Sequence, residues 1–279
     1  MRFLVPFFLA ALLPNAAMAE EETLPLWELR AGGFGLYAPD YPASGNYSFN
    51  GLAFPNIQYR GDFLRLGGQA AARVVPIDNP RFEVGVSVDG SFSANSDDNP
   101  LREGMPDLGF LFEVGPELII RGPEFQAGRG AGTLDFALQG RAVFSADFDE
   151  GIAYEGLVLE PIARFRIDGI LGEGSRLSGS IGPIFATEGL HDYFYEVAPE
   201  FARPGRPAFD AQSGYLGTEA SIGLSYPVTE RFRVFGSVGL GYYGGAANTG
   251  SPLYEDDLNA FAFLGASFTL FQSERQVRR

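Results

Sequence analysis

The chain contains a single histidine, His191, and Asp192 follows it directly. A histidine beside a carboxylate is the pair from which general bases and activated nucleophiles are built. Ester hydrolysis by such a base also requires a serine within hydrogen-bond reach, and residues adjacent in sequence need not face one another. A lone histidine in a loop usually belongs to the plain surface. We therefore predict no catalytic residue and a protein that is not an enzyme.

Metal chemistry would have to rest on carboxylates, because one histidine and no cysteine cannot build a histidine or thiolate cluster. Asp97-Asp98-Asn99 and Glu255-Asp256-Asp257 carry the oxygen ligands that calcium prefers, but runs of this kind are typically solvated loop tips. Gly130-Ala131-Gly132 and Gly239-Leu240-Gly241 are strand or turn glycines, because no helix follows them to complete a phosphate-binding loop. We predict no metal site and no cofactor site, with calcium at the acidic runs as the alternative.

The charge of the chain disfavours a nucleic-acid partner. The formal net charge is -15, and all 20 basic residues are arginines. Nucleic-acid binding requires a basic stripe, which this sequence lacks. The acidity suits a solvated surface, or acidic loops that hold divalent cations beside a lipopolysaccharide layer.

Segments in which apolar and polar residues alternate, as in β-strands, run through almost the whole chain and would position these residues. From Arg81 to Phe92 the even positions are apolar or glycine, and the odd positions are polar or small. The hairpin Ser221–Tyr243 repeats this design in two runs. So do the segments Leu108–Arg121, Leu134–Asp147 and Glu155–Asp168. The strands are roughly 11 to 15 residues long, against about 5 or 6 in soluble proteins.

Two architectures use such strands. A soluble sandwich or lipocalin-like barrel turns the apolar phase inward, whereas an outer-membrane barrel turns it toward lipid. The polar phase here consists of glycine, serine and alanine with a few charges, which suits a crowded interior better than a solvent face. A tilted span needs about 9 to 11 residues, which the strands provide. We predict an all-β protein, an antiparallel up-and-down transmembrane barrel of the bacterial outer membrane.

The N-terminal segment 1–19 reads as a secretory signal peptide. Arg2 gives a basic start, an apolar stretch runs from Phe3 to Leu13, and Ala17-Met18-Ala19 is a small-x-small cleavage site. The apolar stretch is shorter than the ~20 residues of a membrane span. We expect cleavage after Ala19 and a mature chain, 20–279, that forms a single barrel domain.

The number of strands has to be even if both termini lie in the periplasm. Eleven candidate segments are present: 26–37, 51–60, 63–74, 81–92, 107–121, 133–145, 154–168, 176–188, 213–226, 231–243 and 259–271. Gly67-Gly68 can divide the third of them into two short strands, which gives twelve. If that segment is not a span, the count is ten. We favour twelve. Tyr226–Arg231 and Arg60–Asp62 resemble periplasmic turns, and Gly189–Gln212 and Gly244–Leu258 resemble extracellular loops.

Charged residues of both signs fall on the inward phase and are expected in the lumen. They are Glu28, Arg30, Arg65, Arg73, Glu83, Asp89, Glu113, Glu117, Asp135, Arg141, Glu160, Arg164, Arg166 and Glu219. Arginine and carboxylate could pair across the barrel and plug it, or the lumen could be a small-solute channel. We favour the plug, because a pore for one class of solute would show a dominant sign.

Several short motifs resemble the MipA/OmpV family, the MltA-interacting proteins of the outer membrane. In order they are WELRAGGFGLY at 27–37, Pro39-Asp40-Tyr41, FPNIQYRGDF at 54–63, LREGMPDLG at 101–109, YFYEV at 193–197, Ser213-Gly214-Tyr215, the hairpin Ser221–Tyr243, and Ser251-Pro252. The resemblance covers essentially the whole mature chain. Glu196 stands where a glycine is expected, and residues 272–279 extend past the last strand.

The resemblance implies a barrel that acts as a scaffold. The named member links a membrane-bound lytic transglycosylase, MltA, to a bifunctional penicillin-binding protein, and other members are adhesion or stress-related surface proteins. We therefore predict a non-catalytic scaffold for murein-synthesising and murein-hydrolysing enzymes, with a diffusion channel or a surface adhesin as alternatives. The expected partners are the lipid bilayer, lipopolysaccharide, a lytic transglycosylase and a penicillin-binding protein.

Overall fold

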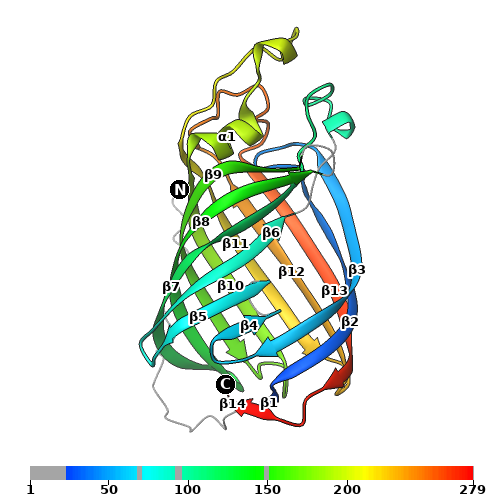
Figure 1. The fold of residues 1–279 in the computed structure, drawn as a ribbon, viewed down its shortest axis with the longest axis vertical. Coiled ribbons are helices and arrows are strands. Elements are labelled where there is room, and N and C mark those ends of the chain that lie inside the picture. Colours follow the sequence, from blue (N-terminus) through cyan, green and yellow to red (C-terminus); the bar gives the residue numbers. More distant parts are fainter. Residues whose placement is uncertain (1–22, 68–70, 92–95, 148–150, 279) are drawn as a thin grey trace, which may run out of the picture.

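The structure is a computed structural model that describes residues 23–67, 71–91, 96–147 and 151–278. The predicted signal peptide, 1–19, lies outside the described residues. Twelve antiparallel strands close into one barrel (Figure 1), as predicted. In chain order they are β2 (Trp27–Pro39), β3 (Tyr47–Arg60), β4 (Leu64–Leu66), β5 (Ala72–Asp78), β6 (Phe82–Ser91), β7 (Phe110–Ala127), β8 (Gly130–Asp147), β9 (Gly151–Asp168), β10 (Arg176–Ala186), β11 (Gly214–Pro227), β12 (Phe232–Tyr242) and β13 (Leu258–Gln272).

Each strand pairs with its neighbours in the chain, and β13 pairs with β2 to close the barrel. Strands β7, β8 and β9 have 18 residues each, longer than the predicted 11 to 15. A residue rises about 3.3 Å in a strand, so these three exceed what a tilted span requires and project beyond it.

The predicted apolar phase faces outward. In the hairpin of β11 and β12, Ile222 lies directly opposite Val238, and Ala220 lies opposite Leu240. Ile222, Val238 and Leu240 are about half exposed, at 46%, 56% and 52%. Side chains alternate between the two faces of a strand, so the residues between them point into the barrel. This confirms the predicted orientation of the hairpin, whose turn lies between Pro227 and Phe232.

The predicted segment 63–74 divides as predicted, into the three-residue β4 and the seven-residue β5, which continues to Asp78. Gly67 adopts a left-handed φ of 68°, and its N–H donates to Ala71 O at 3.1 Å to close the turn. A Cβ at Gly67 would lie 3.1 Å from both Asn56 Oδ1 and Ile57 O. Both the backbone conformation and the close contacts therefore favour glycine at this turn. Because β4 and β5 are separate strands of the barrel, the alternative of ten strands is wrong.

The two ends of the barrel differ. Short turns join the strands at one end, here named the turn end, and the loops 40–46, 96–109, 187–213 and 243–257 gather at the other, the loop end (Figure 1). This distribution matches the predicted turns and loops. The loops also contain two 3-10 turns, η1 (Ser96–Asp98) and η2 (Pro199–Phe201).

The long loop 187–213 contains a helix, α1 (Glu188–Tyr195), where no helical segment was predicted. Eight residues make little more than two turns, so the 3.6-residue period has no room to stand out in the sequence. Its buried residues, Leu190, His191, Phe194 and Tyr195, do lie on one face. The described part of the chain has no helix with the length and hydrophobicity to traverse a bilayer.

The first and last described segments of the chain meet at the turn end. Thr23–Pro25 forms β1 and Gln276–Arg278 forms β14, and they pair antiparallel with Leu24 opposite Val277. Figure 1 shows this two-stranded sheet below the barrel. We name it the terminal clasp. The tail that extends past the last strand thus turns back and pairs with the segment just before β2.

Candidate functional site

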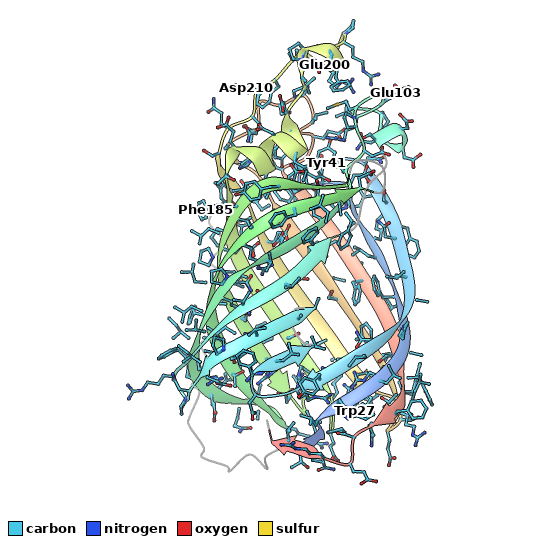
Figure 2. The ribbon with its side chains drawn as sticks, in the orientation of Figure 1. Trp27, Tyr41, Glu103, Phe185, Glu200 and Asp210 are labelled. Carbon is cyan, nitrogen blue, oxygen red and sulfur yellow. The ribbon has the colours of Figure 1, made fainter. Side chains whose placement is uncertain are left out.

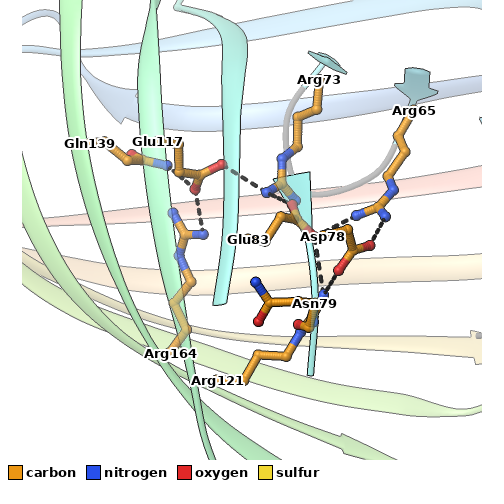
Figure 3. A network of polar contacts seen from close by, with 9 residues as sticks. All are labelled: Arg65, Arg73, Asp78, Asn79, Glu83, Glu117, Arg121, Gln139 and Arg164. Atoms are coloured by element: carbon orange, nitrogen blue, oxygen red, sulfur yellow. Dashed lines mark hydrogen bonds and ion pairs between the residues drawn. The ribbon is translucent and has the colours of Figure 1, made fainter. Parts of the chain in front are cut away.

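Arginines and carboxylates of four neighbouring strands meet inside the barrel (Figure 3). Glu83 on β6 accepts from Arg65 on β4 at 2.6 Å and also pairs with Arg73 on β5. Arg65 reaches Asp78 on β5 at 2.5 Å. Arg121 on β7 pairs with Asp78 and lies 3.3 Å from Glu83. The short strands β4 and β5 are therefore tied to β6 and β7 by side chains as well as by backbone.

Glu117 on β7 is a second centre of the same network. It forms an ion pair with Arg73 at 3.0 Å and accepts from Arg164 on β9 at 2.9 Å. The side-chain amide of Gln139 on β8 donates to the same carboxylate at 2.6 Å. Because Arg73 contacts both Glu83 and Glu117, the contacts are continuous from β4 to β9. We name this set the lumen network: Arg65, Arg73, Asp78, Glu83, Glu117, Arg121, Gln139 and Arg164.

The centre of the lumen network is withdrawn from water. Glu83 and Glu117 are 4% and 3% exposed, and Arg73 is 9% exposed. A buried charge costs several kcal/mol of solvation unless partners compensate it. Each of the two carboxylates has at least two guanidinium partners, which satisfies this condition. The buried ion pairs therefore occupy the part of the lumen beside β4 to β9.

Two smaller ion-pair groups extend the filling. Arg141 on β8 lies 2.9 Å from Glu113 and 3.6 Å from Glu160. Near the turn end, Glu28 on β2 pairs with Arg30 and accepts from Arg60 at 3.0 Å. Arg60 also donates to Pro25 O at 2.6 Å, which links the wall to the terminal clasp.

The strand register places all fourteen predicted lumen residues on the inner face, and it brings most of them together. Within the described residues Asp89, Asp135 and Glu219 make no ion pair, and Glu219 accepts from the Tyr243 hydroxyl at 3.0 Å. The prediction missed Asp78, because a bulge between Val74 and Ile77 changes the strand phase ahead of it. It also missed Arg60 and Arg121. Arg121 belongs to the predicted polar phase of β7, so the sequence did carry a signal for it.

Part of the inner face is apolar, which the sequence analysis did not predict. Phe34 on β2 contacts Phe263 on β13 with ring centres 5.0 Å apart, and Phe263 stacks on Phe235 of β12 at 5.7 Å. Leu52 on β3 lies directly opposite Phe34 and is 50% exposed. With Phe261, these residues form the aromatic wall: Phe34, Leu52, Phe235, Phe261 and Phe263.

Glycines on neighbouring strands make room for the rings. A Cβ at Gly239 would collide with the ring of Phe261, and one at Gly265 would collide with the ring of Phe235. The Gly239-Leu240-Gly241 motif is therefore part of a strand, as predicted, and one of its glycines lies beneath an aromatic ring. The inner surface of the barrel is divided between an ionic side on β4 to β9 and an aromatic side on β2, β3, β12 and β13.

The loop end is closed by a hydrophobic core made from several loops and the adjoining ends of β7 to β11, here named the loop cap (Figure 2). The Tyr41 hydroxyl donates to Leu253 O at 2.8 Å, and the Tyr195 hydroxyl donates to Pro42 O at 2.9 Å. Ser251 Oγ donates to Tyr195 O at 2.7 Å. Burial raises the pKa of Tyr41 to about 12. The core residues are Tyr41, Leu108, Leu111, Val143, Val158, Ala186, Leu190, Phe194, Tyr195, Val197, Ala211, Leu216 and Leu253.

His191 lies inside the loop cap rather than on the plain surface where it was predicted. Its side chain is fully buried, with Nε2 3.3 Å from Gly214 O. Helix α1 turns this side chain inward, and burial lowers its pKa. Asp192 lies instead beside a pocket of about 430 Å³ that Tyr193 also lines. His191 and Asp192 are therefore neighbours in sequence but lie in different environments.

The predicted acidic runs hold loops together. Asn99 is buried and donates to Asp40 at 2.9 Å. Glu255 is exposed and accepts from the backbone N–H of Gly45 at 2.7 Å, and Asp257 accepts from the Tyr254 hydroxyl at 2.7 Å. The described residues contain no group of three or more histidines, cysteines or carboxylates placed to hold a metal. The absence of a metal or cofactor stays a prediction.

Solved structures with a similar architecture are outer-membrane proteins at low sequence identity. A NanC porin is 10% identical with a TM-score of 0.38, covering 88% of this chain and 100% of its own. OprB of Pseudomonas putida is 8% identical with a TM-score of 0.38, covering 88% and 94%. Outer membrane phospholipase A of Escherichia coli is 12% identical with a TM-score of 0.33, covering 87% and 92%. These likenesses carry no information about activity.

Comparison at the level of sequence gives a family. A search of curated proteins finds no match. A family profile described as MltA-interacting protein MipA matches residues 31–270, from the first long strand to the last. The matched range contains ten of the twelve barrel strands, β3 to β12, in full and most of β2 and β13 at its edges. The chain is therefore a membrane β-barrel that belongs to the MltA-interacting protein MipA family.

Proposed function

We propose that this protein is a non-catalytic barrel of the bacterial outer membrane whose periplasmic end is a scaffold for murein enzymes. The belt of outward apolar side chains supports the location: Phe49 and Leu264 are 74% and 72% exposed and would contact lipid. The family description supports a murein enzyme as the partner. The turn end then lies in the periplasm, where the terminal clasp is accessible.

The observation that carries the proposal is the network of buried ion pairs in the lumen. A diffusion channel requires a continuous aqueous path, but here Glu83 and Glu117 are almost fully buried among arginines, and the loop cap closes the other end. A barrel that does not conduct is best suited to present surfaces at its two ends. The burial of His191 against Gly214 O likewise favours a structural role for the only histidine.

Conductance of the purified barrel in planar bilayers tests the closed lumen. We expect no reproducible unitary steps from the wild-type barrel. Replacing Arg73, Glu117 and Arg164 with alanine removes three linked side chains of the lumen network but leaves the loop cap, so steps should still be absent. Steps from the wild-type barrel would instead establish the diffusion channel.

Affinity capture from detergent-solubilised envelopes tests the scaffold. We expect the full chain to retain a lytic transglycosylase or a penicillin-binding protein. A variant that lacks residues 273–279 removes β14 and should lose the partner while its barrel still folds. The matched control, Glu274→Gln, changes one charge in the same tail. If the full chain captures neither class of enzyme, the scaffold proposal fails.

A further inference from the structure

Strands β7 to β10 form a hollow on the outer surface of the barrel. Its volume is about 440 Å³, within the roughly 300–1,000 Å³ of small-molecule pockets. The described residues that line it are all apolar. The hollow opens on the side of the wall that carries the apolar phase, so it faces the hydrocarbon of the membrane.

A small residue at the floor creates the hollow. Ala163 on β9 lies directly opposite Phe136 on β8 and directly opposite Ile181 on β10. Phe136 and Ile181 are 50% and 54% exposed, so both project outward. Because Ala163 carries only a methyl group, an elongated apolar group can lie across it, with the two larger side chains as walls.

Two prolines face each other beside this floor. Pro161 on β9 and Pro183 on β10 both line the hollow. Strands β9 and β10 keep a single register on both sides of this point, which places Pro183 opposite Pro161, but the two strands form no pair there. Proline within a sheet is normally confined to edges and bulges, so two opposed prolines inside a closed wall are unusual.

The two prolines occupy a position at which opposed residues normally exchange both backbone hydrogen bonds. Thr187 N–H donates to Leu157 O at 3.0 Å, and backbone groups alternate in direction along a strand. By this alternation, the backbone groups of Pro161 and Pro183 point toward each other. Neither proline has an N–H, so the carbonyl oxygen of each lacks its donor from the opposite strand.

The two carbonyl oxygens differ in their surroundings. A Cβ at Gly182 would lie 2.5 Å from Pro161 O, so this oxygen lies against the glycine. Gly182 is on the inward phase of β10, where it lies opposite Glu219 on β11. Pro161 O is therefore displaced toward the lumen, and Pro183 O is the acceptor that remains for a group in the hollow.

The depth of the hollow decides which part of a lipid can supply the donor. Pro161 and Ala163 lie well inside β9, away from both ends of the strand. The polar head of a lipid stays at the membrane surface, so only its hydrocarbon chain reaches this depth. An unpaired carbonyl is unfavourable in hydrocarbon. The occupant that fits both the walls and the acceptor is a hydrocarbon chain with a hydrogen-bond donor along its length.

We propose that this hollow binds an acyl chain of a membrane lipid that carries a hydroxyl group on the chain. The chain lies over Ala163 between Phe136 and Ile181, and the hydroxyl donates to Pro183 O. The site requires that the protein is a membrane β-barrel, but neither the scaffold role nor its partners. Failure of the affinity capture would leave it unaffected.

Competition between lipids at a single tryptophan tests the site. Trp27 is the only tryptophan, so Trp27→Phe gives a silent background. In that background Leu159→Trp reports the hollow, because Leu159 is 48% exposed and lies two residues before Pro161 on the same face of β9. Val238→Trp reports the outer face of β12. Brominated phosphatidylcholine quenches both reporters, and a lipid without bromine relieves the quenching where it binds.

Two competing lipids differ only in the hydroxyl: phosphatidylcholine with 12-hydroxyoctadecanoyl chains and phosphatidylcholine with octadecanoyl chains. At Leu159→Trp we expect the hydroxylated lipid to compete about fivefold better, the factor that one net hydrogen bond provides. At Val238→Trp the two lipids should compete equally. Equal competition at Leu159→Trp, or the same preference at both reporters, would overturn the site.

The prolines themselves provide a matched pair of variants in the Leu159→Trp background. Pro161→Ala restores the N–H that faces Pro183 O, so the preference for the hydroxylated lipid should disappear. Pro183→Ala restores the N–H that faces Pro161 O and leaves the oxygen of residue 183 free, so the preference should persist. Each variant removes one ring from the hollow. If both variants keep the preference, or both lose it, the hydroxyl does not bind at Pro183 O.

A last pair of variants tests the floor of the hollow. Ala163→Phe fills it and should abolish the preference, whereas Ala220→Phe, on the outer face of β11 opposite Leu240, should leave it unchanged. Equal effects would contradict binding over Ala163. Heat-modifiable gel mobility shows that each variant is folded.

A second copy of the chain is the other occupant that the hollow could take. The protein contains no cysteine, so Ala163→Cys introduces a single thiol at the floor. We expect monomers after oxidation in the membrane. Efficient disulfide-linked dimers would mean that a second barrel covers the hollow, and the lipid site would be refuted.

Discussion

The charge balance of the lumen network can be tested by a single substitution. Replacing Glu117 with glutamine keeps the size of the side chain but removes the negative charge that faces Arg73 at 3.0 Å and Arg164 at 2.9 Å. The side chain is 3% exposed, so water cannot replace the lost charge. Removal of one partner from a buried ion pair costs about 3–5 kcal/mol, because the remaining charge stays buried. The substitution leaves the guanidiniums of Arg73 and Arg164 without this carboxylate, but each still has an oxygen of the new amide or another carboxylate nearby.

We therefore expect Glu117→Gln to lower the free energy of unfolding by about 3 kcal/mol, which is roughly a hundredfold in the folding equilibrium constant. The assay is urea unfolding of the barrel in detergent, followed by heat-modifiable gel mobility. Glu124→Gln is the matched control, because Glu124 is on the same strand and is exposed. Its effect should stay within about 0.5 kcal/mol.

A double variant separates a network from a simple loss of packing. Glu117→Gln with Arg164→Gln removes both partners of one pair and leaves less uncompensated charge. The double variant should be less destabilised than the sum of the two single variants, by about 1–3 kcal/mol. Strict additivity, or a Glu117→Gln variant as stable as the wild type, would refute the reasoning that these charges depend on one another.

Three further predictions concern the two ends of the barrel. Burial and the neighbouring Glu196, Glu188 and Asp210 raise the pKa of Asp192 to about 6, so the folded loop favours the protonated carboxyl. The contribution of this protonation to the stability of the loop is complete below pH 4 and is lost as the pH rises through 6. Asp192→Asn should therefore slow proteolysis of loop 187–213 at pH 8 and leave it unchanged at pH 4, and equal effects at both values would contradict this assignment. Tyr195→Phe removes the hydrogen bond to Pro42 O and should destabilise the loop cap by about 1 kcal/mol, seen as faster hydrogen exchange in α1 while β7 to β9 keep their protection. Val277→Pro removes a backbone donor from β14 and should release residues 273–279 to protease without a change in heat-modifiable mobility, whereas a protected tail would mean that the terminal clasp does not depend on strand pairing.

The wall of the barrel could be predicted from the sequence because lipid and lumen impose one alternation on every strand. Ile222 and Leu240 show the outward phase as clearly as Glu83 and Glu117 show the inward one. The Gly67-Gly68 pair gave the break between β4 and β5. Each of these features depends on residues close together in the chain, where period and turn chemistry are visible.

The contents of the barrel could not be predicted in the same way. Whether Arg73 meets Glu117 depends on the relative shift of strands β5, β6 and β7, which no local pattern records. The aromatic wall escaped prediction because Phe34, Phe235 and Phe263 come from different strands, and β2 meets β13 only where the barrel closes. Helix α1 was too short to show its period. The missed features therefore depend on strand offset and distant contacts.

The terminal clasp indicates at one end of the molecule whether the whole barrel has closed. Every other strand pair of the barrel joins neighbours in the chain. The pair β2 and β13 joins the first and last long strands, which can meet only when every strand between them is in place. The clasp continues this seam below the barrel, so β1 and β14 lie side by side only after closure. A protein that recognises the paired ends would bind completed barrels and pass over chains that are still being assembled.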